Sequence, residues 1–255
     1  MSLYVETSGE GPNVVFLHGW GMNAEVWFEI QQVFEENYRV TVIDLPGHGR
    51  SQSENLGVDF DALVELVEAN IPDHCILVGW SLGGVVAQSI AIRYPQKLNK
   101  LVLVASNAQF QQSDNWHCAM KPEVLENFVQ NLHQDYKSTL QQFLMLQALG
   151  AENAKKTIRE LKQRLFLHGE PETVALENGL LFLKNVSVLE DLHKITIPSL
   201  IVNGRLDSLV PAAAGEKMQQ MIPQSEFKLI DKAGHAPFLS HSDLFINYLK
   251  EFLSK

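Results

Sequence analysis

The chain has 255 residues, a length typical of one large α/β domain with room for an inserted subdomain. Hydrophobic residues make up 45% of it and charged residues 20%, and these ordinary globular proportions exclude collagen-like, coiled-coil and intrinsically disordered proteins. The formal net charge of −10 argues against a nucleic-acid partner, because a phosphate backbone requires a basic surface.

The two cysteines and the N-terminus predict the environment of the protein. Cys75 and Cys118 are far apart and belong to no Cys-x-x-Cys motif or Cys/His cluster, so we expect neither a disulfide nor a metal site. The first residues carry no targeting signal, and no apolar run approaches the roughly 20 residues of a membrane span. We expect a cytoplasmic protein without a membrane partner, and we expect it to be a monomer.

Over the first 110 residues, short apolar runs alternate with longer amphipathic stretches, the pattern of parallel strands joined by crossover helices. The predicted strands are 14–17, 40–43, 75–78 and 101–104, and the predicted helices lie near 24–36, 58–70 and 82–94. These strands are rich in β-branched residues and do not alternate with polar ones, so we expect them to be buried on both faces. The fold class is therefore α/β, with a mostly parallel central sheet flanked by helices.

The alternation stops at about residue 111 and resumes after residue 185. The segments between these points have helical length and lie roughly at 122–133, 135–149, 151–167 and 171–184. They predict an all-helical lid over 111–185, inserted into a core domain made of 1–110 and 186–255. The core then continues with strands at 197–202 and 227–230 and helices near 211–221 and 241–253.

Residues 79–83 read Gly-Trp-Ser-Leu-Gly and join a predicted strand to a predicted helix, the context of a G-x-S-x-G nucleophile elbow. The two glycines let the strand and the helix approach each other around a serine with a strained backbone. The first turn of the helix directs free N–H groups at developing negative charge. We therefore predict that Ser81 is a nucleophile. The alternative is a turn or helix-capping serine.

A serine nucleophile needs a base, and the base needs an orienting acid, in the chain order Ser, Asp or Glu, His. Asp207 follows the predicted strand 197–202, and His235 follows the predicted strand 227–230. Both therefore lie at the carboxyl ends of strands, at the same sheet edge as Ser81. The alternatives are a helix-capping aspartate and a surface histidine, one of nine in the chain. Their order and placement together favour a catalytic triad.

Two backbone N–H groups are needed to hold the oxyanion of an acyl-transfer reaction. One is expected from Leu82, directly after the nucleophile, and the other from Trp20 in the loop after the first predicted strand. The Trp20 indole could also form a wall of the acyl pocket, or simply pack in the core. His18 precedes this loop; it is a rival base, but a histidine ahead of glycines more often orders the loop by hydrogen bonding.

Together these segments resemble the α/β-hydrolase superfamily over essentially the whole chain. The resemblance rests on residues 18–21, 44–51, 79–84, 204–207 and 234–237. It implies the α/β-hydrolase fold and a structural, non-catalytic role for Asp44, whose carboxylate would tie backbone amides. A serine at position 81 disfavours dehalogenases and epoxide hydrolases, which would be expected to place an aspartate there. Cofactor-free haloperoxidases and carbon–carbon bond hydrolases keep the serine and stay open.

Finer detail resembles the methyl ester esterases that act on pimeloyl-acyl carrier protein in biotin synthesis. This similarity lies in residues 17–27, 79–84 and 143–147. It implies hydrolysis of the methyl ester at the far end of an acyl chain, with release of methanol and without a cofactor or metal. It also implies a substrate-binding site made of Trp20, Ser81, Leu82, His235 and the lid residues Phe143, Leu144, Met145, Leu146 and Gln147. For any one lid residue, packing between lid helices is the alternative.

The predicted helix 151–167 is basic in an otherwise acidic chain. Its cations are Lys155, Lys156, Arg159, Lys162 and Arg164. Lys155, Arg159 and Lys162 are spaced to share one helix face. Acyl carrier proteins are strongly acidic, so we expect this face, with Lys155, Lys156 and Arg159 at its centre, to dock one. The alternative is a solvated helix face. Related enzymes carry arginines where this chain has Ser138 and Gln142, with Lys137 as a nearby substitute.

Two other functions fit the same residues. A broad-specificity short-chain carboxylesterase would use the same triad without a carrier protein. A non-catalytic receptor for a small ligand, known on this fold, would keep the pocket without useful turnover. Labelling of Ser81 by a fluorophosphonate separates an active hydrolase from such a binding protein.

Overall fold

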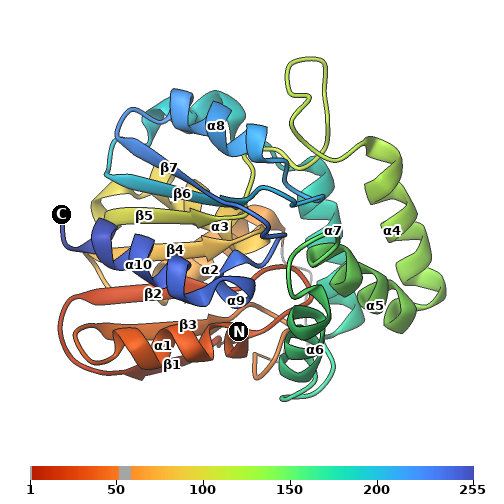
Figure 1. Cartoon of the computed structure of the whole chain (residues 1–255), viewed down its shortest axis with the longest axis horizontal. Helices are drawn as coiled ribbons and strands as arrows, with labels where there is room; N and C mark the ends of the chain where they lie inside the picture. The colour runs from red at the N-terminus through yellow and green to blue at the C-terminus, as the bar shows by residue number, and fades with distance from the viewer. Residues whose placement is uncertain (1, 52–58) are drawn as a thin grey trace.

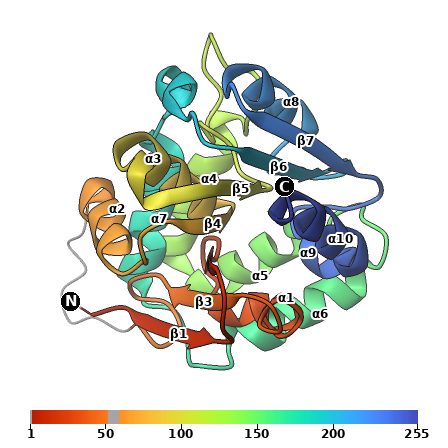
Figure 2. The same cartoon turned by 90° about the vertical axis from the view of Figure 1, so that its left-hand side faces the viewer.

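The computed structural model describes residues 2–51 and 59–255. The strands of these residues form one seven-stranded sheet in the order β1-β3-β2-β4-β5-β6-β7 (Figures 1 and 2). The strands are β1 (Tyr4–Ser8), β2 (Asn13–Leu17), β3 (Arg39–Asp44), β4 (Cys75–Trp80), β5 (Leu98–Val104), β6 (Ser199–Gly204) and β7 (Ser225–Ile230). All neighbours pair in parallel except β1, which runs antiparallel to β3. The predicted α/β class with a mostly parallel sheet is confirmed.

The central strands are buried as their apolar composition predicts. Every residue of β4 and of β6 is buried, whereas β7, at the sheet edge, is mostly half-buried. The missed strand, β1, reads Tyr-Val-Glu-Thr-Ser and alternates between half-buried and exposed residues. It lacks the continuous apolar run that identified the other strands, because it covers only an edge of the sheet.

Helices cover both faces of the sheet and one end of it (Figures 1 and 2). They are α1 (Phe28–Phe34), α2 (Phe60–Ala69), α3 (Leu82–Arg93), α4 (Pro122–Gln134), α5 (Tyr136–Gln147), α6 (Ala154–Leu165), α7 (Thr173–Asn185), α8 (Ala212–Met221), α9 (Pro237–Ser240) and α10 (Ser242–Leu253). The predicted helix 24–36 is divided into a 3-10 turn (Ala24–Trp27) and α1, and α10 is preceded by the short α9. None of the helices in residues 2–51 and 59–255 is long and apolar enough to cross a bilayer.

Helices α4 to α7 follow one another, as predicted, and gather at one end of the sheet (Figure 1). α4 packs against α5 and α7, and α5 packs against α6. We continue to propose that 111–185 form a lid on a core made of 1–110 and 186–255. Cys75 and Cys118 are both free thiols.

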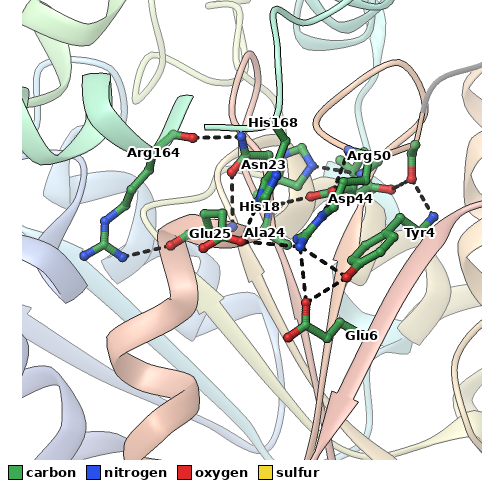
Figure 3. Close-up of polar contacts among 12 residues, drawn as sticks. Tyr4, Glu6, His18, Asn23, Ala24, Glu25, Asp44, Arg50, Arg164 and His168 are labelled. Atoms are coloured by element: carbon green, nitrogen blue, oxygen red, sulfur yellow. Dashed lines mark hydrogen bonds and ion pairs between the residues drawn. The ribbon is translucent and has the colours of Figure 1, made fainter. Parts of the chain in front are cut away.

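The C-terminal end of α6 is fastened to the core beside the turn before α1 (Figure 3). The Arg164 guanidinium donates to the Glu25 carbonyl oxygen at 2.8 Å and lies 2.8 Å from the Glu29 carboxylate. In return, the Asn23 side-chain amide donates to the Arg164 carbonyl oxygen at 2.9 Å. His168, just beyond α6, lies 2.7 Å from the Glu25 carboxylate. These bonds hold the end of α6 against the turn before α1, near the loop that contains Trp20.

Replacing Arg164 with glutamine should lower the free energy of unfolding by about 1–2 kcal/mol, because charge-assisted bonds to partly buried carbonyl groups are lost. Urea unfolding followed by circular dichroism measures the change. Lys162→Gln is the matched control, since Lys162 is exposed on the same helix and has no ion pair among the described residues. Equal effects of the two substitutions would show that Arg164 does not fasten the lid.

Candidate active site

Ser81 occupies a strained turn between β4 and α3. Its backbone angles are φ 54° and ψ −117°, a region that non-glycine residues adopt at a cost of about 1–3 kcal/mol. A Cβ on Gly79 would lie 2.4 Å from the Gly83 carbonyl oxygen, and one on Gly83 would lie 2.5 Å from the His18 carbonyl oxygen. The steric need for glycines two positions before and after Ser81 is therefore confirmed.

The structure brings Ser81, His235 and Asp207 together at the carboxyl ends of β4, β7 and β6. His235 Nε2 lies 2.9 Å from Ser81 Oγ, and His235 Nδ1 lies 2.8 Å from Asp207 Oδ2. Because Nδ1 faces a carboxylate, it carries the proton, and Nε2 is left to accept the hydrogen of the serine hydroxyl. The second Asp207 oxygen accepts the amides of Leu209 and Val210 at 2.8 and 2.9 Å. This chain of hydrogen bonds can deprotonate a serine nucleophile.

Two contacts that the sequence analysis missed hold the His235 backbone. The Trp80 indole donates to the His235 carbonyl oxygen at 2.8 Å, and the His235 amide donates to the Gln147 carbonyl oxygen at 2.8 Å. The last residue of α5 therefore holds the loop that contains His235. Trp80 immediately precedes Ser81, which is the one sequence signal for its role. A backbone carbonyl such as that of Gln147 leaves no signal in the sequence.

The loop that contains Trp20 lies against Ser81: a Cβ on Gly19 would be 3.1 Å from the Ser81 Cβ. The Gly19 carbonyl oxygen accepts His18 Nδ1–H at 2.8 Å and the Met22 amide at 3.2 Å. The Gly19 carbonyl and the Trp20 N–H belong to one planar trans peptide group and point in opposite directions. Holding the carbonyl therefore orients the Trp20 N–H. His18 Nε2 accepts the Leu45 amide at 2.8 Å, so both ring nitrogens order the loop, as expected, and neither serves as a base.

The amides of Trp20 and Leu82 have no hydrogen-bond partner within the part of the chain that the structure describes. Leu82 is the first residue of α3, where N–H groups have no helical acceptor. Both groups are therefore able to bind an oxyanion, and that role stays a proposal. The Trp20 indole donates to the Leu176 carbonyl oxygen of α7 and packs edge-on against Phe143 of α5, with ring centroids 4.7 Å apart.

The Asp44 carboxylate ties backbone amides together, as the resemblance implied (Figure 3). Oδ1 accepts the Ala24 amide at 2.7 Å, and Oδ2 accepts the Arg50 amide and Nε at 2.8 and 3.1 Å. Burial opposes ionisation of this carboxyl, but attraction to His18, the two amides and the Arg50 side chain outweigh it and lower its pKa. Arg50 continues to Tyr4 and Glu6 of β1, so the cluster joins the sheet edge to the loops beside the site.

The predicted lid residues separate into two groups. Phe143, Leu144 and Gln147 are buried and Leu146 is partly buried, whereas Met145 is 53% exposed on the other face of α5. The structure thus places Met145 away from the other predicted substrate-binding residues. Among the described residues, the buried Gln147 side-chain amide has no hydrogen-bond partner at either its oxygen or its nitrogen. It is free to bind a polar group of a substrate.

On α6, Lys155, Lys156, Arg159 and Lys162 are exposed. Lys156 lies 3.7 Å from Glu160, whereas no ion pair of Lys155, Arg159 or Lys162 occurs among the described residues. Two cations considered for the docking surface are already engaged. Arg164 binds the core, and Lys137 lies 2.7 Å from Glu170. The unpaired positive charge of this region is therefore concentrated on one side of α6.

Residues 2–51 and 59–255 place no group of three or more metal-ligating side chains together. The absence of a metal and of a cofactor stays a prediction.

The sheet order and the elbow at Ser81 define a protein of the α/β-hydrolase class, and the family model for the alpha/beta hydrolase fold matches residues 12–242. A pimeloyl-[acyl-carrier protein] methyl ester esterase from Aeromonas hydrophila is 42% identical over 254 residues, covering 99% of this chain and 100% of the relative. The one from Vibrio cholerae is 36% identical over 255 residues, covering 100% and 99%. The chain belongs to the family of these esterases within the α/β hydrolases.

More distant solved structures share the fold. An esterase from Exiguobacterium antarcticum aligns with a TM-score of 0.87 at 24% identity, covering 99% of this chain and 96% of its own. A bromoperoxidase from Bacillus anthracis aligns with a TM-score of 0.89 at 22% identity, covering 99% and 95%. At these identities the likeness concerns the fold alone.

We expect His48, in the loop after β3, to make the stability of the fold sensitive to acid. Its Nδ1 donates to the Pro46 carbonyl oxygen at 2.9 Å, and its buried Nε2 has no partner in residues 2–51 and 59–255. Burial, reinforced by the neighbouring His18, lowers the pKa of His48 to about 4. Because the folded-state pKa lies below the usual value, folding stabilises the neutral ring. The contribution of His48 to stability is complete above about pH 6.5 and is lost as the pH falls toward 4.

We expect His48 to lower the free energy of unfolding by about 2 kcal/mol between pH 7 and pH 5, because only the unfolded chain then binds the proton. Urea unfolding at both pH values measures this. A His48→Asn variant should lose that part of the pH dependence, and the exposed His117→Asn control should retain it. A pH dependence unchanged in His48→Asn would contradict the assignment.

Proposed function

We propose that this chain is a serine carboxylesterase of biotin biosynthesis that hydrolyses pimeloyl-acyl carrier protein methyl ester to pimeloyl-acyl carrier protein and methanol. The observation that carries the proposal is the hydrogen-bonded chain from Ser81 through His235 to Asp207, at 2.9 and 2.8 Å. The full-length similarity to esterases named for this substrate supports it. The cytoplasmic location and the monomeric state expected from the sequence stay predictions.

In the first step, Ser81 Oγ attacks the ester carbonyl carbon while His235 Nε2 takes the hydroxyl proton. The amides of Trp20 and Leu82 bind the oxygen that becomes negative, and Asp207 stabilises the positively charged imidazole. When the tetrahedral intermediate collapses, His235 donates its proton to the departing methoxy oxygen, and methanol leaves. Water then attacks the acyl-enzyme by the same sequence, with His235 as the base, and frees Ser81.

The acyl chain would reach Ser81 beneath α5 and α7. Ser81 is 2% exposed, so a substrate contacts its hydroxyl only after the lid helices shift. Phe143 and Leu144 offer buried apolar surface that suits an alkyl chain, and Trp20 and Leu82 continue this surface to the nucleophile. The unpartnered Gln147 amide is the polar group of this set. Met145, on the exposed side of α5, is left out of the proposed acyl site.

Carrier docking is proposed on the unpaired cations of α6. Lys155, Arg159 and Lys162 are exposed and have no acidic partner among the described residues, so they are available to an external acidic surface. A cationic patch on a chain of net charge −10 gives an acidic carrier one favourable orientation and repels it elsewhere. Lys156, with its partial pairing to Glu160, contributes less to the proposed surface.

Replacing Ser81 with alanine should reduce ester hydrolysis by at least about 10⁴-fold while the substrate still binds, because the nucleophile is lost and the pocket is kept. Methanol release from carrier-bound pimeloyl methyl ester and hydrolysis of nitrophenyl butyrate measure the effect, together with rescue of growth without biotin. Ser89→Ala is the control, since Ser89 is a buried serine of α3, the helix that begins directly after Ser81, and its hydroxyl has no partner among the described residues. Appreciable turnover by Ser81→Ala would exclude Ser81 as nucleophile. Turnover of the butyrate alone by the wild type would favour a broad-specificity esterase.

Reversing both charges in Lys155→Glu/Arg159→Glu should lower kcat/KM for the carrier-bound ester by about tenfold or more at low salt and leave the free short ester unchanged. Arg39→Glu/Lys250→Glu is the control with the same change in net charge, made at exposed residues outside α6. The wild-type advantage should shrink as salt is added. Equal losses on both substrates, or equal losses in both double variants, would remove the docking proposal.

A further inference from the structure

A second strained turn supports the elbow at Ser81. β5 ends at Val104, and the next residue, Ala105, has a φ of 43°, another left-handed angle at a non-glycine residue. The two turns are joined directly. The Ser81 amide donates to the Val104 carbonyl oxygen at 3.0 Å, and the Ser106 hydroxyl donates to the Ser81 carbonyl oxygen at 2.8 Å.

Ser106 packs directly against the turn that contains Ser81. It is fully buried, and a Cβ on Gly84 would lie 2.4 Å from its Cβ and Oγ, so the glycine at position 84 admits this hydroxyl. The buried Gln88 side chain donates to the carbonyl oxygens of Gly84 and Asn107 at 3.1 and 3.2 Å and fastens both sides of Ser106. Ser106 lies 25 residues after Ser81 in the chain, outside the motif around the nucleophile.

The hydrogen bond from Ser106 acts on the peptide group that carries an oxyanion donor. The Ser81 carbonyl and the Leu82 N–H belong to the same planar trans peptide and point in opposite directions. The Gly84 and Val85 amides of α3 also donate to this oxygen, at 2.9 and 3.3 Å, so Ser106 fixes the direction of the N–H together with the first turn of the helix. His18 holds the Gly19 carbonyl in the same way and thereby orients the Trp20 N–H.

We propose that Ser106 is a positioning residue that aims the Leu82 amide at the oxyanion, as His18 aims the Trp20 amide. The proposal rests on the proposed function, because only a reaction with a developing oxyanion uses these two N–H groups. The negative charge on that oxygen develops in the transition state and is absent from the bound ester. Loss of the Ser106 hydroxyl therefore lowers kcat and leaves KM nearly unchanged.

The test compares Ser106→Ala with Ser199→Ala, using nitrophenyl butyrate so that carrier docking plays no part. Ser199 is a matched control: it is fully buried and donates to the Ile197 carbonyl oxygen at 2.9 Å, at the amino end of β6. A fluorophosphonate titration counts active sites, so that rates refer to folded enzyme. Ser106→Ala should lower kcat about tenfold with KM within twofold, less than the 10²–10³-fold loss of a whole oxyanion donor.

A trifluoromethyl ketone supplies a second readout. Ser81 Oγ adds to its carbonyl carbon, the carbonyl π pair becomes the oxyanion, and the serine proton passes to His235. Ser106→Ala should weaken the binding of this inhibitor by the same factor as it lowers kcat and should keep the wild-type pH profile of kcat.

A kcat within twofold of wild type, a change in KM alone, or an equal loss in Ser199→Ala would overturn the proposal. A wild type that cleaves the butyrate but not the carrier-bound methyl ester contradicts the proposed substrate and leaves this comparison decisive for Ser106.

Discussion

The left-handed backbone of Ser81 is the constraint on which the rest of the structure depends. A φ of 54° at a non-glycine residue is unfavourable in isolation, and it persists because its surroundings leave no alternative. Gly79 and Gly83 admit the backbone atoms that crowd the turn, and the Val104 carbonyl and Ser106 hydroxyl hold the Ser81 peptide groups. This backbone conformation directs Ser81 Oγ toward His235 and leaves the Leu82 amide, the first of α3, without a helical acceptor. One unfavourable angle thus places both the proposed nucleophile and a proposed oxyanion donor.

The helices of the proposed lid contribute contacts to the site as well as cover it. The Gln147 carbonyl at the end of α5 holds the His235 amide, and the Leu176 carbonyl of α7 holds the Trp20 indole. Motion of the lid therefore changes the support of the proposed base and of the oxyanion loop together. Since Ser81 is buried while these bonds are made, we propose that these helices move to admit an ester. Substrate access and active-site order are coupled through α5 and α7.

Sequence reasoning was most successful where one residue type has one physical role. Continuous β-branched runs identified the buried strands, and the order of Ser81, Asp207 and His235 identified three side chains that the fold brings within hydrogen-bonding distance. Edge strand β1 was missed because its half-exposed residues carry no apolar run. Trp80 and Ser106 were missed because each acts on a backbone carbonyl, and such a partner has no residue signature. Met145 was grouped with its neighbours although helical geometry turns it away from Phe143 and Gln147.

The positive charge available at the surface depends on which cations are paired with acids inside the molecule. A cation contributes to an external surface only if no internal acid neutralises it, and the structure engages Arg164 and Lys137 internally. What remains is the unpaired row Lys155, Arg159 and Lys162 on α6, which directly follows α5 in the chain. The connection between α5 and α6 lies against the His235 loop: a Cβ on Gly234 would be 3.5 Å from the Ala151 Cβ, and the Glu152 amide donates to the Lys232 carbonyl oxygen at 2.9 Å. A carrier bound at the proposed surface would therefore sit beside the segment that must move for its acyl chain to reach Ser81.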